Sequence, residues 1–98
     1  MAPEQSPSAA TIRDNPAARR YEGILDGNVA GFVDYLDRRG RRILVHTEVD
    51  PTYAGRGVGN RHVAGALDGA RASGLKVLIV CPFLRAFVER HPEYQPDA

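Results

Sequence analysis

The sequence has few of the features that mark secreted or membrane proteins. It contains a single cysteine, Cys81, which cannot form an internal disulfide, so a disulfide-stabilised scaffold is excluded. No apolar run is long enough to span a bilayer, and the first residues lack the charged and apolar regions of a signal peptide. We therefore expect a cytoplasmic protein that has no membrane partner.

A marked excess of charge of either sign is also lacking. The 13 basic and 12 acidic residues leave a formal net charge of +1, so nucleic acid is not an expected partner. No metal site is predicted. Hydrophobic residues make up 43% and charged residues 26% of the 98 positions, which is typical of one small globular domain with a single core.

One domain, residues 13–94, is predicted between two tails, residues 1–12 and 95–98. The N-terminal tail is rich in Ala, Pro and Ser and has no periodicity, which is typical of a flexible segment. The domain begins with an antiparallel meander of three strands, placed at residues 20–25, 28–36 and 41–49. Asp26-Gly27 is predicted to join the first two strands, because a type I′ hairpin turn needs positive φ at both central residues.

A helix is predicted over residues 57–72, where apolar side chains recur at the helical spacing i, i+3, i+4 and i+7: Val63, Ala66, Leu67 and Ala70. The apolar run of residues 75–80 indicates a strand buried on both faces, and a second helix is predicted to begin at Pro82. A strand, a helix and a strand in sequence form a crossover, so the two strands are expected to be parallel. The predicted fold class is therefore α/β, a mixed sheet with the order β-β-β-α-β-α.

The strand over residues 41–49 carries polar side chains just before the predicted helix. Strict alternation places Leu44, His46 and Glu48 on one face of this strand and Ile43, Val45, Thr47 and Val49 on the other. His46 and Glu48 are therefore predicted to lie together at the end of the strand.

A glycine-rich loop lies between this strand and the helix, with glycines at Gly55, Gly57 and Gly59. Glycines let a backbone approach an anion closely, and the first turn of a helix leaves its N–H groups unpaired, so the pattern indicates a phosphate site. The alternative is that the glycines only make a tight turn. The spacing matches the dinucleotide-binding fingerprint only in part, and that fingerprint follows the first strand of its fold rather than a meander.

The segment from Thr47 to Gly59 resembles the acetyl-coenzyme A loop of the GNAT superfamily of N-acetyltransferases. Gly57 and Gly59 match the two small positions of the superfamily pattern, whereas Ala54 stands where a Gln or Arg is usual. The chain is most similar to a short single-domain branch, on four motifs: His46-Thr-Glu-Val49, Ala66-Leu-Asp68, Cys81-Pro-Phe83 and His91-Pro-Glu-Tyr94.

The resemblance implies that acetyl-CoA is the donor and that backbone N–H groups hold its pyrophosphate. It implies a cofactor-binding set made of Val49, near the acetyl and pantetheine groups, and the loop residues Gly55, Arg56, Gly57, Val58, Gly59 and Asn60. Arg56 is also the side chain best suited to a coenzyme phosphate.

Three side chains are candidates for catalysis. Cys81 lies between a strand and a helix N-terminus, whose partial positive charge favours a thiolate; the alternative is a small buried apolar residue. Glu48 or His46 is a candidate base, because attack on a thioester needs a neutral amine. The alternatives are a solvated carboxylate and a structural histidine.

These features predict an acetyl-CoA-dependent N-acyltransferase acting on an amine acceptor, either a small molecule or a protein or peptide amine, as a monomer or homodimer. One alternative is a non-catalytic acyl-CoA-binding or regulatory module. Another is a plain protein-interaction domain.

Overall fold

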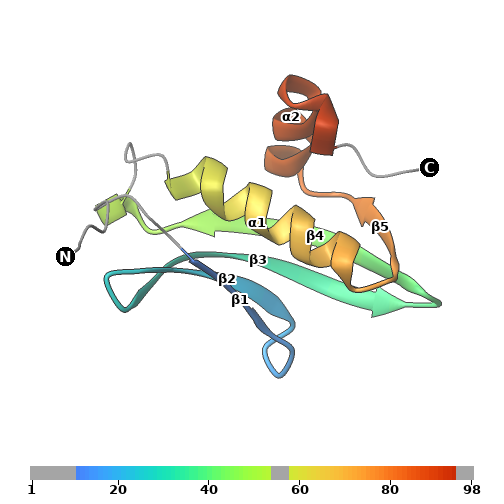
Figure 1. The fold of residues 1–98 in the computed structure, drawn as a ribbon, viewed down its shortest axis with the longest axis horizontal. Helices are drawn as coiled ribbons and strands as arrows, with labels where there is room; N and C mark the ends of the chain where they lie inside the picture. The colour runs from blue at the N-terminus through green and yellow to red at the C-terminus, as the bar shows by residue number, and fades with distance from the viewer. Residues whose placement is uncertain (1–10, 54–57, 95–98) are drawn as a thin grey trace.

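The computed structural model describes residues 11–53 and 58–94, which form one five-stranded sheet with two α-helices packed against it (Figure 1). The spatial order is β1-β2-β3-β4-β5; the pairings up to β4 are antiparallel, and β4 pairs with β5 in parallel. The strands are β1 (Thr11–Asn15), β2 (Arg20–Leu25), β3 (Asn28–Arg38), β4 (Arg41–Val49) and β5 (Lys76–Ile79). The helices are α1 (Val58–Ala72), α2 (Pro82–Arg90) and the short 3-10 helices η1 (Pro51–Tyr53) and η2 (Pro92–Tyr94). This mixed α/β architecture confirms the predicted fold class. No helix in the described part of the chain is long and apolar enough to cross a membrane.

Strand β1 was not predicted, so four strands rather than three precede the glycine loop. Thr11 and Ile12 belong to this strand and not to the predicted flexible tail; residues 1–10 and 95–98 lie outside the described ranges. Apolar and polar residues do not alternate regularly in β1, and the contacts of this strand are with residues distant in sequence. Ile12 packs against Gly65 of α1, and the Tyr35 hydroxyl donates a hydrogen bond to Asp14 at 2.6 Å. Tertiary packing, which short-range patterns do not report, therefore holds this strand.

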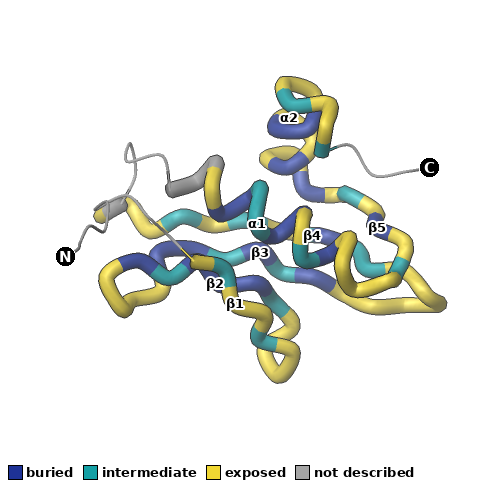
Figure 2. The backbone as a smooth tube through the Cα atoms, viewed as in Figure 1, coloured by how far each residue is buried: buried dark blue, intermediate teal, exposed yellow. Residues whose placement is uncertain are grey.

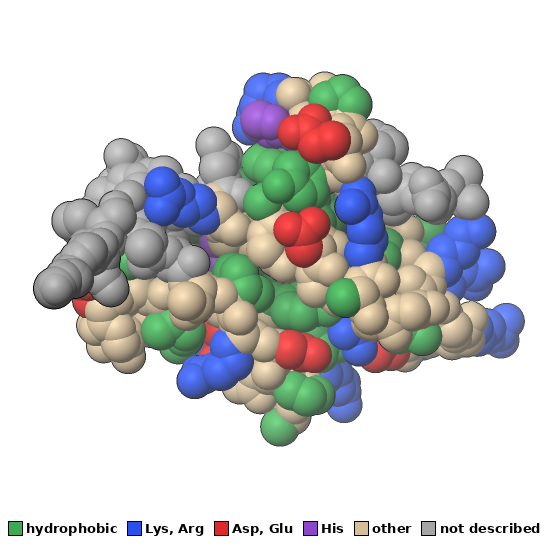
Figure 3. Space-filling view, in the orientation of Figure 1, with side chains coloured by type: hydrophobic (Ala, Val, Ile, Leu, Met, Phe, Trp, Pro, Cys, Tyr) green, Lys and Arg blue, Asp and Glu red, His purple; other side chains and the backbone are tan. Residues whose placement is uncertain are grey.

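Two hairpin turns fix the register of the meander. Asp26 (φ 54°) and Gly27 (φ 79°) both have positive φ, which confirms the predicted turn. Arg39 (φ 55°) and Gly40 (φ 77°) form the corresponding turn between β3 and β4. Figure 3 shows Lys and Arg side chains gathered at this β3–β4 end of the molecule. The first turn of α1 lies at the opposite end of the sheet (Figure 1), so this basic end is not part of the predicted phosphate site.

A β-bulge in β4 changes which side chains share a face. Asp34 pairs with His46 but Tyr35 pairs with Leu44, so Val45 is an extra residue in β4. Leu44 therefore points to the same side as Tyr35, into the core beneath α1, and not to the side of His46 as alternation predicted. His46 and Glu48 do share a face, as predicted. The strict period of two fails at the bulge because one unpaired residue reverses the alternation.

One hydrophobic core joins α1 and α2 to the sheet. The predicted stripe of α1 is confirmed, since Val63, Ala66, Leu67 and Ala70 are all buried. Figure 2 shows the buried positions lining α1 and the strands behind it. The prediction that residues 75–80 are buried on both faces was wrong. Val77 is buried, whereas Leu78 and Val80 are 39% and 55% exposed, because the core with both helices lies on the other face of the sheet.

Candidate functional site

Strands β4 and β5 diverge part-way along their length. Their pairing ends at Leu44 and Ile79, and the Leu44 carbonyl accepts hydrogen bonds from the N–H groups of Val80 (2.9 Å) and Cys81 (3.2 Å). β4 continues to Val49, whereas the chain after β5 turns away into α2. Beyond the bulge, β4 therefore has a strand edge whose main-chain groups do not pair with β5. We call this opening the β4–β5 split.

Cys81 lies at the base of the split. It is the N-cap residue of α2 with Pro82 directly after it, as predicted, and its carbonyl accepts the Arg85 N–H at 3.0 Å. The thiol is buried (3% exposed) and donates a hydrogen bond to the Thr47 hydroxyl at 3.5 Å. This contact joins α2 to β4 across the split. Its role in catalysis stays a prediction.

His46 and Glu48 form a pair on the face of the sheet opposite α1. The His46 Nε2 atom lies 2.9 Å from a Glu48 carboxylate oxygen, and the two side chains are 53% and 61% exposed. Thr47, between them in sequence, points the other way toward Cys81, because neighbouring residues of a strand face opposite sides. The three candidate catalytic side chains are thus in two groups, one on each face of β4.

The predicted coenzyme loop is described only in part. Gly55, Arg56 and Gly57 lie outside the described residues, whereas Val58, Gly59 and Asn60 form the first turn of α1. The first turn of α1 contains no acidic residue. Val49 ends β4 and packs against the small cluster of Leu25 and Ala30.

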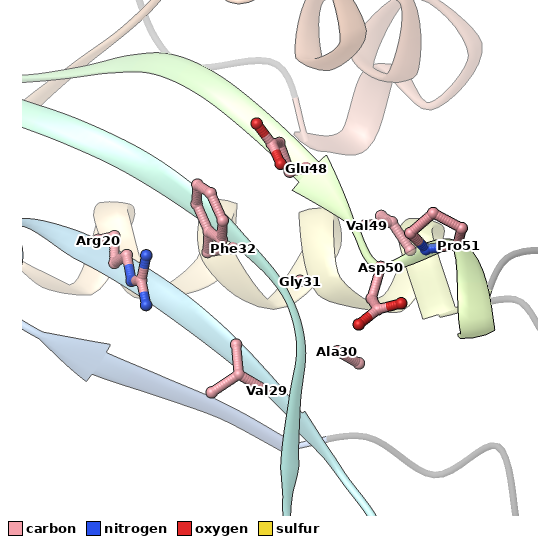
Figure 4. A pocket seen from close by; sticks show the side chains of 9 residues that line it. All are labelled: Arg20, Val29, Ala30, Gly31, Phe32, Glu48, Val49, Asp50 and Pro51. Carbon is pink, nitrogen blue, oxygen red and sulfur yellow. The ribbon is translucent and has the colours of Figure 1, made fainter.

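A cavity that was not predicted lies beside the His46–Glu48 pair. It measures about 310 Å³ and lies where β3 and β4 meet the turn after β4 (Figure 4). Its walls mix charged and apolar side chains: Arg20, Val29, Ala30, Gly31, Phe32, Glu48, Val49, Asp50 and Pro51. The signal that could have pointed to it is the spacing of Arg20 and Glu22, two opposite charges on one face of a strand.

Glu22 is the most strongly held carboxylate in the described part of the chain. Its side chain is 3% exposed and accepts hydrogen bonds from Arg13 (2.6 Å), Arg20 (2.9 Å) and Asn15 (3.1 Å). The hydrogen bonds from Arg13 and then Arg20 lower the pKa of Glu22 from 4.5 to about 2. Glu22 is therefore ionised in the folded protein near neutral pH and fixes the position of Arg20.

His62 is a second residue that sequence reasoning missed. It is fully buried in α1, and its ring packs against Gly23 of β2, where a Cβ atom would collide with it. Burial lowers the pKa of the ring, and the main chain of Phe32 opposes this only in part. Within the described ranges neither ring nitrogen has a partner with hydrogen-bond geometry. We therefore regard His62 as a neutral packing residue.

Comparison with known proteins adds the decisive observation. The family model described as "GCN5-related N-acetyl-transferase" matches residues 20–97, which is most of the chain. The chain belongs to this family, which is the GNAT superfamily of the predicted resemblance. It is also similar to the bovine protein named "Protein NATD1", with 36% identity over 101 residues, which cover 90% of this chain and 89% of the relative.

Membership of the GNAT family indicates acyl transfer as the activity of the domain. The match begins at β2 and so includes both faces of β4, the split and α1. The predicted resemblance to the GNAT superfamily is confirmed at this level.

Proposed function

We propose that the protein is an acetyl-CoA-dependent N-acyltransferase that acts on a primary amine. The observation that carries the proposal is the β4–β5 split, which opens beyond Leu44 toward the end of the sheet where α1 begins. Only residues 50–57 separate the end of β4 from the start of α1, so the open strand edge and the helix N-terminus are close. An extended ligand with a phosphate at one end fits this arrangement.

The chain's own groups suit the two ends of such a donor. Main-chain N–H groups from Gly55 to Asn60 would hold the pyrophosphate, aided by the partial positive charge of the α1 N-terminus. The open edge of β4 would pair with the amide groups of the pantetheine arm, as an added strand does. A main-chain N–H near Val49 would donate to the thioester oxygen, where negative charge develops during attack.

The transfer needs a base, and the His46–Glu48 pair is the group best placed to supply it. The amine nitrogen forms a bond to the acyl carbon while the carbon–sulfur bond breaks. One proton passes from the nitrogen to Glu48, and the departing thiolate takes up a proton from solvent, so the products are an amide and a free thiol. His46 Nε2, at 2.9 Å, would stabilise the charge on Glu48 and accept its proton in turn.

Direct attack by the amine is favoured over a covalent relay through Cys81. The Cys81 thiol is buried and already hydrogen-bonded to Thr47, on the face of β4 away from Glu48. A thiol in that position suits a wall of the split rather than a nucleophile that exchanges acyl groups with a solvent-facing amine.

Binding of acetyl-CoA to Gly57→Glu tests the donor site. A carboxylate introduced into the phosphate loop should raise the Kd for acetyl-CoA at least about tenfold, which corresponds to about 1.4 kcal/mol. Ala86→Glu on the exposed side of α2 is the matched control, because it adds the same charge away from the loop. Equal affinity of the wild type and Gly57→Glu would remove the loop from the site. Tight binding without transfer to any amine would instead assign the protein as a non-catalytic acyl-CoA-binding module.

A further inference from the structure

We propose that the cavity beside Glu48 binds the acceptor, and that the acceptor is a small primary amine that also carries a carboxylate. This inference rests on the proposed acyl transfer and extends it to the class of acceptor. It is carried by the position of the cavity, the fixed guanidinium of Arg20 and the two carboxylates on the opposite wall.

The cavity and the β4–β5 split share one strand. Glu48 and Val49 line the cavity from β4, and the other edge of the same strand faces the split. Figure 4 shows the lining side chains on β2, β3, β4 and the turn after β4, with α1 behind the strands. An amine bound in the cavity is therefore one strand away from the edge along which the donor would extend.

Arg20 presents a guanidinium held in place on this surface. Its Nε atom donates to Glu22 at 2.9 Å, and the guanidinium carbon lies 4.5 Å from the centre of the Phe32 ring. Among the described residues, the two terminal Nη atoms have no hydrogen-bond partner. A fixed guanidinium with free N–H groups beside a cavity is suited to a ligand carboxylate, which accepts two parallel hydrogen bonds.

Glu48 and Asp50 make the other wall of the cavity negatively charged. Glu48 is paired with His46, and Asp50 accepts a hydrogen bond from the Thr52 N–H at 2.9 Å, which leaves further acceptor positions on both carboxylates. They attract the ammonium form of the acceptor, which releases one proton to solvent before attack and passes a second proton to Glu48 as the amide forms. Because one wall is positively charged and the other is negatively charged, the cavity favours a ligand that has both an amine and a carboxylate.

The spacing of the strands limits the length of this ligand. Glu48 is the cross-strand neighbour of Phe32, over which the Arg20 guanidinium lies. Neighbouring strands are about 4.8 Å apart, so the two charged groups are separated by roughly one to two strand spacings, about 5–10 Å. The volume of about 310 Å³ is near the lower end of small-molecule sites. An amino acid with a short apolar chain between its two ends fits both limits.

Transfer kinetics with two matched amines test the proposal. The probes are γ-aminobutyrate and n-butylamine, which differ only in a carboxylate and a methyl group. For the wild type with acetyl-CoA, kcat/KM should be at least about tenfold higher for γ-aminobutyrate, mainly through KM, as expected for one bidentate contact. In Arg20→Met the ratio of the two kcat/KM values should fall to about one.

Arg13→Met is the matched control. Arg13 also forms an ion pair with Glu22 but does not line the cavity, so this variant should keep the preference for γ-aminobutyrate. Loss of the preference in both variants would mean that the Glu22 cluster acts through folding, and would overturn the role of Arg20. Equal turnover of the two amines by the wild type would overturn carboxylate recognition, and a preference for peptide N-termini would assign the cavity to a peptide.

Two binding measurements separate this proposal from the proposed function. Calorimetry with acetyl-CoA alone reports the donor site, and an NMR titration with γ-aminobutyrate alone reports the cavity. Chemical-shift changes at Arg20 and Phe32 in the wild type, absent in Arg20→Met, support the cavity even if acetyl-CoA does not bind. Binding of acetyl-CoA with no response to γ-aminobutyrate would overturn the acceptor class and leave the donor site in place.

Discussion

Glu22 offers the sharpest test of the electrostatics of the open sheet face. Glu22→Gln keeps the shape of the side chain and removes its charge, which leaves Arg13 and Arg20 facing a neutral amide. A carboxyl pKa that falls from 4.5 to about 2 corresponds to about 3 kcal/mol, at about 1.4 kcal/mol for each pH unit. Because the Arg13 side chain is 61% exposed, solvent screening reduces this figure. We therefore expect Glu22→Gln to lower the free energy of unfolding by about 1–2 kcal/mol near neutral pH.

The ion pairs of Glu22 also make the stability of the fold depend on pH. The folded state holds Glu22 ionised while the unfolded chain takes up a proton below pH 4.5, so its contribution is present above pH 4.5 and is lost as the pH falls toward about 2. The free energies of unfolding can be measured by urea denaturation followed by circular dichroism. The difference between the wild type and Glu22→Gln should shrink by roughly half or more between about pH 5.5 and about pH 3.

Glu93→Gln is the control for this experiment. Glu93 is a largely exposed carboxylate whose nearest basic partner is 3.9 Å away, so its neutralisation should change the free energy of unfolding by less than about 0.5 kcal/mol. Equal stability of wild type and Glu22→Gln near neutral pH, or parallel curves on acidification, would refute the reasoning about the Glu22 cluster.

Two further predictions concern His62 and Cys81. Burial holds the His62 ring neutral in the folded protein, so stability should be constant above about pH 6.5 and fall below it, by at most about 1.4 kcal/mol for each pH unit. Denaturation of His62→Gln should lack this slope between about pH 7 and about pH 5.5, and an unchanged slope would contradict a buried neutral ring. For Cys81, intact-protein mass spectrometry after exposure to acetyl-CoA should show no acetyl adduct, and Cys81→Ala should keep turnover within about threefold of the wild type. An adduct on Cys81 together with loss of turnover in that variant would establish a covalent relay.

The sequence predicted the elements whose signals are local. The turn at Asp26-Gly27 depends on two residues that tolerate positive φ, and the core stripe of α1 depends on a spacing within one helix. Three features were missed or wrong because they depend on distant partners: β1, the bulge at Val45 and the exposed face of β5. The bulge can be recognised only when β4 is aligned with β3, because no residue type in β4 indicates it.

The parts of the candidate site that depend on residues close in sequence were also predictable, and the parts that depend on distant residues were not. His46 and Glu48 were placed together correctly because they are two residues apart on one strand and both follow the bulge. The separation of Cys81 from this pair follows from the contact with Thr47, across a distance of 34 residues in sequence. The cavity needed three strands in register to bring Arg20 and Phe32 beside Glu48, which no motif in the sequence records.

Mapping of acetyl-CoA binding by NMR tests the donor site most directly. Saturable chemical-shift changes are predicted at the amides of Val45–Val49 in β4 and of Val58–Asn60 at the start of α1. The amides of the Arg39-Gly40 hairpin should not respond, because this turn lies at the opposite end of the sheet from the first turn of α1 (Figure 1). Absence of any response, or a response that leaves both β4 and the start of α1 unchanged, would contradict a donor site in the β4–β5 split.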